Sequence, residues 1–172
     1  MNKQVWFAHG KESGPWGSKI KALAAVAQSR GFTVESPDYS DSFDPDVRVA
    51  RLLALKPRAD CLVLVGSSMG GYVSAVAARQ LQPAGLFLIA PAFYLPGYEQ
   101  EPEPRAGLIE VVHGWDDEIV PAEHALRFAR RQRCPLHMLP GGHTLVERLP
   151  VLEPLFARFL EQVVAAVANR RP

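Results

Sequence analysis

The chain has 172 residues, of which 48% are hydrophobic and 22% charged, and its formal net charge at pH 7 is +1. A chain of this length can bury one substantial core but is too short for two domains of ordinary size, so we expect a single domain over residues 1–172. The nearly balanced charge argues against a strongly basic protein that binds nucleic acids or anionic membranes electrostatically.

Short apolar segments alternate with longer segments of helical periodicity along the chain. The apolar segments predict strands at 5–8, 32–35, 61–65, 85–90, 108–113 and 136–139. The periodic segments predict helices at 18–30, 45–55, 69–80, 121–132 and 145–168. We expect Ser18 to cap the first helix, and Pro150 or Pro154 can break the last one.

This alternation is typical of crossover connections, which place parallel strands in one sheet with helices on both faces. The predicted strands are continuous apolar runs, as in parallel strands that are buried on both sides. The sequence therefore predicts an α/β fold, a three-layer α/β/α sandwich around a doubly wound, mostly parallel six-stranded sheet.

Three features of the sequence bear on the cellular compartment. Two cysteines, Cys61 and Cys134, are too few for a disulfide framework, and we interpret them as reduced, mostly buried thiols. No apolar run reaches the length of a transmembrane helix. Residues 1–4 lead directly into the first strand, without the apolar stretch of a signal peptide. These features indicate a cytoplasmic protein.

Four of the predicted strands end in segments that carry chemically distinctive residues. In a parallel sheet the carboxyl ends of all strands meet at one edge, where ligands bind. The four segments are His9-Gly10, Gly66-Ser67-Ser68-Met69-Gly70, Trp115-Asp116-Asp117, and the loop that carries His143. We therefore expect four separate parts of the chain to converge on this edge.

The segment after the third strand has the pattern Gly-x-Ser-x-Gly between a strand and a helix, which is that of a nucleophile elbow. Gly66 and Gly70 allow the strand and the helix to pass close together, and the spacing selects Ser68 rather than Ser67 as the exposed hydroxyl. A turn rich in Gly and Ser can also bind an anion through its amides. The lysine of a P-loop and the G-x-G-x-x-G spacing are both missing, which favours the elbow.

A serine hydroxyl becomes a good nucleophile only when a base takes its proton. His143 follows the last strand at the expected edge, after two glycines, and is the strongest candidate. The base needs an acceptor that fixes its tautomer, and the segment after the fifth strand offers Asp116 and Asp117. Either aspartate could instead stabilise the start of the next helix.

The other histidines are expected to be structural. We expect His9 and His113 to lie in turns, His124 to be solvated on a helix, and His137 to be packed or paired in a strand.

The chain resembles the α/β-hydrolase superfamily in three motifs that occur in the order of that family. They are His9-Gly10, then Gly66-Ser67-Ser68-Met69-Gly70-Gly71, then His113-Gly114-Trp115-Asp116-Asp117-Glu118-Ile119-Val120-Pro121 followed by Gly142-His143. The likeness spans almost the whole chain and is greatest for small cap-less bacterial serine esterases of the YqiA-like or dienelactone-hydrolase-like kind. Ser68 stands where dienelactone hydrolases have a cysteine nucleophile.

The resemblance has implications for the site and for the sheet. The family pattern H-G-x-x-D-x-x-V-P places the acidic residue on Asp117 and leaves Asp116 as a neighbour. It also implies an oxyanion hole formed by the backbone N–H groups of Lys11 and Met69. The chain lacks the two N-terminal strands of full-length members, so the implied strand order is 2-1-3-4-5-6.

Larger members of the family carry a cap domain between the fourth and fifth strands present here. This chain has only residues 91–107 in that place, so we expect no cap domain and an open site. The candidate walls of the site are the apolar side chains of Trp16, Tyr94, Leu95 and Trp115, with Phe93 and Tyr98, any of which can equally belong to the core. No residues show metal-ligand spacing and no dinucleotide fingerprint occurs, so we expect neither a metal nor another cofactor.

These features together imply a serine hydrolase in which Ser68, His143 and Asp117 cleave short-chain or small aromatic carboxylic esters through an acyl-enzyme. The alternatives are a thioesterase or peptidase with the same residues, or a ligand-binding protein on a hydrolase scaffold that hydrolyses slowly or not at all. The expected partner is a small-molecule ester, with neither nucleic acid nor membrane. The expected oligomeric state is a monomer or a homodimer.

Overall fold

The computed structural model describes residues 1–170, which contain a six-stranded sheet with every neighbouring pair of strands parallel. The strands are β1 Lys3–Ala8, β2 Thr33–Glu35, β3 Cys61–Ser67, β4 Gly85–Ile89, β5 Leu108–Gly114 and β6 Leu136–Leu139. The helices are α1 Ser18–Ser29, α2 Pro45–Leu55, α3 Met69–Leu81, α4 Ala122–Gln132 and α5 Leu149–Ala168, with the short 3₁₀ helix η1 Val146–Arg148. The order across the sheet is β2-β1-β3-β4-β5-β6, which confirms the predicted order and fold class.

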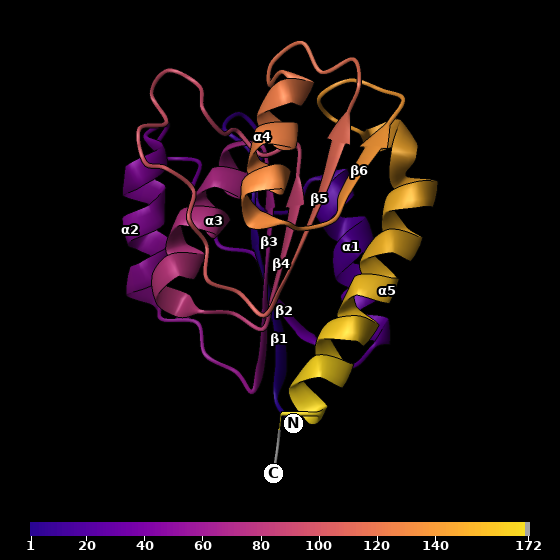
Figure 1. The fold of residues 1–172 in the computed structure, drawn as a ribbon. Coiled ribbons are helices and arrows are strands. Elements are labelled where there is room, and N and C mark those ends of the chain that lie inside the picture. Colours follow the sequence, from indigo (N-terminus) through magenta and orange to yellow (C-terminus); the bar gives the residue numbers. More distant parts are fainter. Residues whose placement is uncertain (171–172) are drawn as a thin grey trace.

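The helices cover both faces of the sheet (Figure 1). On one face, α1 and α5 pack over a core in which the Phe87 ring lies 5.1 Å from Phe156 and 5.3 Å from Phe159, between ring centroids. On the other face, α2, α3 and α4 pack over a second core, where the Phe93 and Phe128 centroids are 4.5 Å apart. Strands β3 and β4 are therefore buried on both sides, as their continuous apolar sequence predicts.

The parallel arrangement brings the strand ends together. All strands run toward the upper edge of Figure 1, so the loops after β1, β3, β5 and β6 lie at that edge. No helix within residues 1–170 combines the length and the apolar character needed to span a membrane.

The helix starts follow the sequence prediction in one case and correct it in another. Asp44 caps α2, because its side chain accepts hydrogen bonds from the amides of Asp46 and Val47 at 2.9 and 3.3 Å. The prediction that Ser18 caps α1 is wrong, since Gly17 occupies the cap position and Ser18 is the first helical residue. Gly17 makes no side-chain cap, so α1 begins without that stabilisation.

Proline does not break the last helix. Pro150 lies in the first turn of α5, where its missing N–H has no helical partner to lose. Pro154 lies inside the helix, but its missing N–H would bond only to the carbonyl of Pro150 near the helix start. The buried side chains of Leu152, Phe156 and Phe159 keep the segment helical on both sides of Pro154.

Residues 90–107, between β4 and β5, contain no helix or strand. This segment is fastened to α2 and α3 through Gln100. The Gln100 amide donates to Tyr72 Oη at 3.1 Å, and its side-chain Nε2 donates to Asp46 Oδ1 at 2.8 Å. Tyr72 Oη in turn donates to Asp46 Oδ1 at 2.9 Å. The segment is thus held against the side of the sandwich that α2 and α3 form.

The close passage of β1 past α3 generates a prediction about stability. A Cβ atom added at Gly70 would lie 1.8 Å from the carbonyl oxygen of Ala8, which is backbone and cannot move aside cheaply. We expect Gly70→Ala to lower the free energy of unfolding by about 3 kcal/mol or more, measured by urea denaturation. Gly14→Ala is the control, because a Cβ at Gly14 meets nothing within 4 Å. Equal denaturation midpoints for the two variants would contradict the prediction.

Candidate active site

Ser68 lies at the sharp reversal between β3 and α3. Its backbone has φ 55° and ψ −119°, a conformation that costs a non-glycine residue about 1–3 kcal/mol. A Cβ atom at Gly66 would lie 2.1 Å from the carbonyl oxygen of Gly70, so the reversal requires glycine there. The strain at Ser68 therefore follows directly from the Gly-x-Ser-x-Gly spacing.

Backbone hydrogen bonds hold the strained residue from both sides. The Ser68 amide donates to the carbonyl of Ile89 at 3.0 Å. The Ser68 carbonyl accepts from the amides of Gly71 and Ala92, both at 2.9 Å. Strand β4 and the chain just after it thus fix the position of the Ser68 side chain.

The side chains of Ser68, His143 and Asp117 form one hydrogen-bonded chain. His143 Nε2 lies 2.8 Å from Ser68 Oγ, and His143 Nδ1 lies 2.8 Å from Asp117 Oδ2. Since an ionised carboxylate can only accept, Nδ1 carries the proton and Nε2 accepts from the serine hydroxyl. This is the arrangement in which a histidine can act as a base toward a serine.

Asp117 is buried, and its environment favours the carboxylate. Oδ1 accepts from the amides of Ile119 and Val120 at 2.9 and 2.8 Å. Burial alone would raise the pKa of Asp117, but the hydrogen bonds from His143, Val120 and Ile119 outweigh it and hold the pKa below its ordinary value. The neighbouring Asp116 is exposed and contacts the next loop through its amide, which donates to the carbonyl of Gly141 at 3.0 Å.

The loop that carries His143 is fixed to two neighbours. The Asp116–Gly141 hydrogen bond ties it to the loop after β5, which carries Asp117. On the other side, Lys19 of α1 donates through Nζ to the carbonyl of Thr144 at 2.7 Å. Burial lowers the pKa of Lys19 to about 8, although the negative charge of Asp117 acts in the opposite direction. Lys19 is not predictable from the sequence, because nothing in its local pattern indicates a contact 125 residues away.

The remaining histidines have defined partners. His113 is buried beside the Asp117 carboxylate, with Nε2 2.8 Å from the Val120 carbonyl and 3.4 Å from Asp117 Oδ2. Burial lowers the pKa of His113, so it is neutral and donates to Val120 in the turn that surrounds Asp117. His137 pairs with Glu110 at 2.6 Å, as predicted. The prediction that His124 is solvated is wrong, because its Nδ1 donates to the carbonyl of Phe93 at 2.7 Å.

The two amides expected to form an oxyanion hole lie on the loop after β1 and at the start of α3. A Cβ atom at Gly10 would lie 3.6 Å from Ser68 Cβ, so this loop runs beside Ser68. Within residues 1–170, neither the Lys11 amide nor the Met69 amide donates a hydrogen bond to another protein group. The Lys11 side chain is exposed, with its ammonium group 5.6 Å from the centre of the Phe43 ring.

The predicted wall residues divide into exposed and packed ones. Trp16 and Trp115, on the loops after β1 and β5, are 45% and 57% exposed. Tyr94 and Leu95 are half-buried, and the Tyr94 ring packs beneath the Arg127 guanidinium at 3.7 Å. Phe93 is fully buried in the core. The two tryptophans are thus the predicted wall residues with the most surface available for a ligand.

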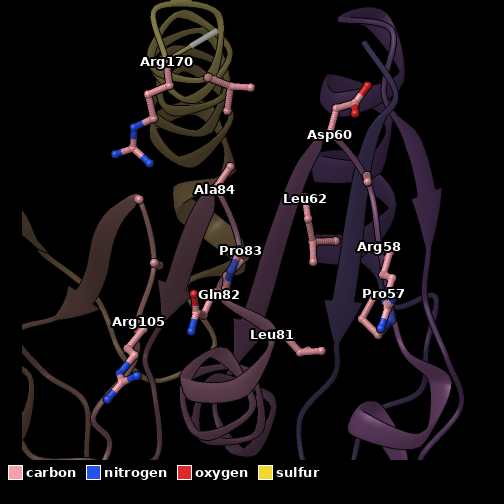
Figure 2. Close-up of a pocket in the computed structure, with 14 residues that line it drawn as sticks. Pro57, Arg58, Asp60, Leu62, Leu81, Gln82, Pro83, Ala84, Arg105 and Arg170 are labelled. Atoms are coloured by element: carbon pink, nitrogen blue, oxygen red, sulfur yellow. The ribbon is translucent and has the colours of Figure 1, made fainter. Parts of the chain in front are cut away.

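A pocket of about 680 Å³ lies at the opposite end of the molecule, near the start of β3 and the end of α5 (Figure 2). Arg58, Arg105 and Arg170 line different sides of it and their side chains do not converge on one point. The pocket lies at the amino ends of the strands, away from Ser68. Among residues 1–170, no group of three or more His, Cys, Asp or Glu side chains is arranged to hold a metal ion.

Comparison with known proteins places this geometry in a family. No protein-family model matches the sequence, nor does any curated protein. A solved structure of an α/β-superfamily protein from Xanthomonas campestris pv. campestris is 32% identical, with a TM-score of 0.87 over 94% of this chain and 99% of that one.

Two further solved structures share the fold at lower identity. Est1E from Butyrivibrio proteoclasticus, solved with ferulic acid bound, is 16% identical, with a TM-score of 0.83 over 95% of this chain and 90% of that one. An esterase from Pyrococcus furiosus is also 16% identical, with a TM-score of 0.74 over 93% of this chain and 81% of that one. Because the chain is 32% identical to the Xanthomonas protein over nearly the full length of both and has the same fold, it belongs to the α/β-hydrolase superfamily.

Proposed function

We propose that the protein is a serine hydrolase that cleaves carboxylic esters through a covalent acyl-enzyme. The observation that carries this proposal is the continuous hydrogen-bonded chain from Ser68 Oγ through His143 to Asp117, with both links at 2.8 Å. A serine whose hydroxyl donates to a histidine that is itself oriented by a buried carboxylate is an activated nucleophile. Membership of a superfamily of hydrolases supports the same reaction class.

In the proposed reaction, Ser68 Oγ attacks the ester carbonyl while His143 Nε2 takes its proton. The imidazolium that forms lies 2.8 Å from the Asp117 carboxylate, which stabilises it. The backbone N–H groups of Lys11 and Met69 donate hydrogen bonds to the developing oxyanion, and one such donor is typically worth about 3 kcal/mol of transition-state stabilisation. His143 then gives the proton to the leaving alcohol.

The second half of the reaction reverses these roles. Water enters after the alcohol has left, and His143 removes a proton from it as it attacks the acyl carbonyl. The tetrahedral intermediate collapses, the acid leaves, and Ser68 regains its proton from His143. No group other than the three side chains and the two amides is required.

The surroundings of Ser68 favour short-chain or small aromatic esters. Residues 90–107 form no cap domain, and Gln100 fastens them to α2 and α3. The exposed indoles of Trp16 and Trp115 offer flat apolar surface on two loops at the same sheet edge. Est1E, which shares the fold, binds ferulic acid, an aromatic acid, and this makes a feruloyl ester a suitable probe.

The first prediction concerns the nucleophile. A fluorophosphonate probe should form a covalent adduct with the native protein, and mass spectrometry should locate it on Ser68. Labelling should be lost in Ser68→Ala and in His143→Ala, because the second variant lacks the base. Ser67→Ala is the matched control, since this neighbouring serine makes no side-chain hydrogen bond to His143, and it should label normally. An adduct on another residue, or none on folded protein, would contradict the proposal.

The second prediction concerns the acid. Asp117→Asn should lower kcat for p-nitrophenyl acetate by about 10³- to 10⁴-fold, because the amide no longer stabilises the correct histidine tautomer or the imidazolium. Asp116→Asn, one residue away and exposed, should stay within about twofold of wild type. Steady-state kinetics on both variants decide between the two aspartates. Equal losses in both would refute the assignment of Asp117.

The third prediction concerns the scissile bond. We expect kcat/KM for p-nitrophenyl acetate and methyl ferulate to exceed that for the matching acetyl thioester and acetyl anilide. The Ser68→Ala variant, measured in parallel, removes any background from uncatalysed hydrolysis. Preferential cleavage of the thioester would point instead to a thioesterase, and preferential cleavage of the anilide to a peptidase.

A further inference from the structure

Arg48 is fully buried in the first turn of α2, and every hydrogen bond it makes goes to a backbone carbonyl. Its Nη1 donates to the carbonyls of His9 and Gly10 at 3.2 and 3.0 Å, and its Nη2 donates to that of Lys11 at 3.1 Å. Its Nε donates to the carbonyl of Ser42 at 2.8 Å. One guanidinium thus holds three consecutive peptide groups of the loop beside Ser68.

The buried position of Arg48 is energetically unfavourable for a cation. None of the ion pairs within residues 1–170 involves Arg48. It lies near the N-terminus of α2, where the helix dipole disfavours positive charge. Its charge is compensated chiefly by the four carbonyl dipoles, with the Tyr39 ring centre 6.0 Å from Arg48 Cζ. Structures that keep such a locally unfavourable group commonly do so at functional sites.

The geometry of the peptide bond connects Arg48 to the oxyanion hole. In a trans peptide the C=O and the N–H point in opposite directions, and the described chain contains no cis peptide. The Gly10 carbonyl is fixed by Arg48 and also accepts from His9 Nδ1 at 2.8 Å. The N–H at the other end of that peptide is the unoccupied Lys11 amide. Holding the carbonyl therefore sets the direction of the Lys11 N–H.

The His9 contact is itself fixed. The Tyr39 amide donates to His9 Nε2 at 3.0 Å, so Nε2 carries no proton and Nδ1 is the donor to Gly10. Burial lowers the pKa of His9, which keeps this neutral tautomer. Two donors, one from α2 and one from the loop itself, thus converge on the same carbonyl oxygen.

We propose that Arg48 is a positioning residue for the oxyanion hole, which holds the Gly10–Lys11 peptide so that its N–H is directed at the developing oxyanion. Arg48 does not touch the substrate. Its positive charge also polarises the peptide and makes the Lys11 N–H a stronger donor. Arginine suits this role because its planar fork reaches several carbonyls at once, whereas lysine offers a single point charge. The inference rests on the proposed ester hydrolysis and assigns a further residue to it.

The test compares an ester with its thionoester analogue, in which sulfur replaces the carbonyl oxygen. An oxyanion hole stabilises the oxygen anion far better than the larger, weakly accepting sulfur, so the ratio of the two kcat/KM values reports on the hole. We expect Arg48→Met to lower kcat for the ester by about 10- to 100-fold with KM little changed, and to lower the ester-to-thionoester ratio by a similar factor. Arg48→Lys, which retains the charge but not the fork, should show an intermediate loss.

Arg51→Met is the matched control. Arg51 lies on the same helix, and its hydrogen bonds go to Asp41 and the Asp38 carbonyl and not to residues 9–11. It should keep the wild-type kcat and ratio. Circular dichroism establishes which variants are folded at the assay temperature. Arg48→Gln, which keeps a planar hydrogen-bond donor, is a third Arg48 variant in case Arg48→Met does not fold.

Each outcome decides the matter. A folded Arg48 variant with wild-type kcat and an unchanged ratio would overturn the proposal, as would a lower kcat with an unchanged ratio. Failure of all three Arg48 variants to fold, with the Arg51 control folded, would assign Arg48 to the structure alone. No turnover of the ester by the wild-type protein would overturn the proposed function as well, which separates that failure from the failure of this inference.

Discussion

The crossing of β1, β3 and α3 is the constraint on which the rest of the site depends. Backbone meets backbone there, because a side chain at Gly66 or Gly70 would collide with the carbonyls of Gly70 and Ala8. The reversal forces Ser68 to a positive φ. Its amide donates to the carbonyl of Ile89, and its carbonyl accepts from the amides of Gly71 and Ala92, which hold it there. Strand β4, the first turn of α3 and the chain just after β4 thus support the strain. The Ser68 side chain therefore has a fixed starting point, and the loops after β5 and β6 are arranged around it.

Electrostatic compensation differs on the two sides of Ser68. On the acid-base side, the buried Asp117 carboxylate accepts from two amides and from His143, with a neutral His113 close by. On the other side, the buried Arg48 guanidinium donates to four carbonyls. Each charge is balanced by backbone dipoles fixed in the fold. In the proposed reaction, a positive charge develops on His143 and a negative one on the substrate, so preorganised dipoles of both signs are already in place.

Much of the fold and part of the site follow from local sequence patterns. Continuous apolar runs indicate the central strands β3 and β4 because these are buried on both faces, whereas the edge strand β2 is Thr33-Val34-Glu35 with both ends exposed. The glycine spacing distinguishes Ser68 from Ser67 because only one of them can occupy the reversal. Long-range side-chain contacts left no such signal. Arg48 and Lys19 occur at ordinary helical positions in the sequence. Both bind backbone carbonyls, which every residue has, so the sequence does not indicate which residues they contact. The Ser18 cap failed for a related reason, since the chain's path into α1 is set by packing and not by cap preference alone.

The absence of a cap domain at residues 90–107 explains why rigidity matters in this site. Enzymes that close a lid exclude water, which strengthens every hydrogen bond to the transition state. Here His143 keeps 16% of its side chain exposed, and the segment that replaces a cap is fastened to α2 and α3. In the proposed reaction no cap domain closes over the substrate, so the proposed oxyanion donors benefit from alignment before it binds. A backbone amide is held most directly through the carbonyl of its own peptide group. In the proposed role, the buried Arg48 does this for three consecutive peptide groups, because it binds their carbonyls and leaves the Lys11 N–H free for the substrate.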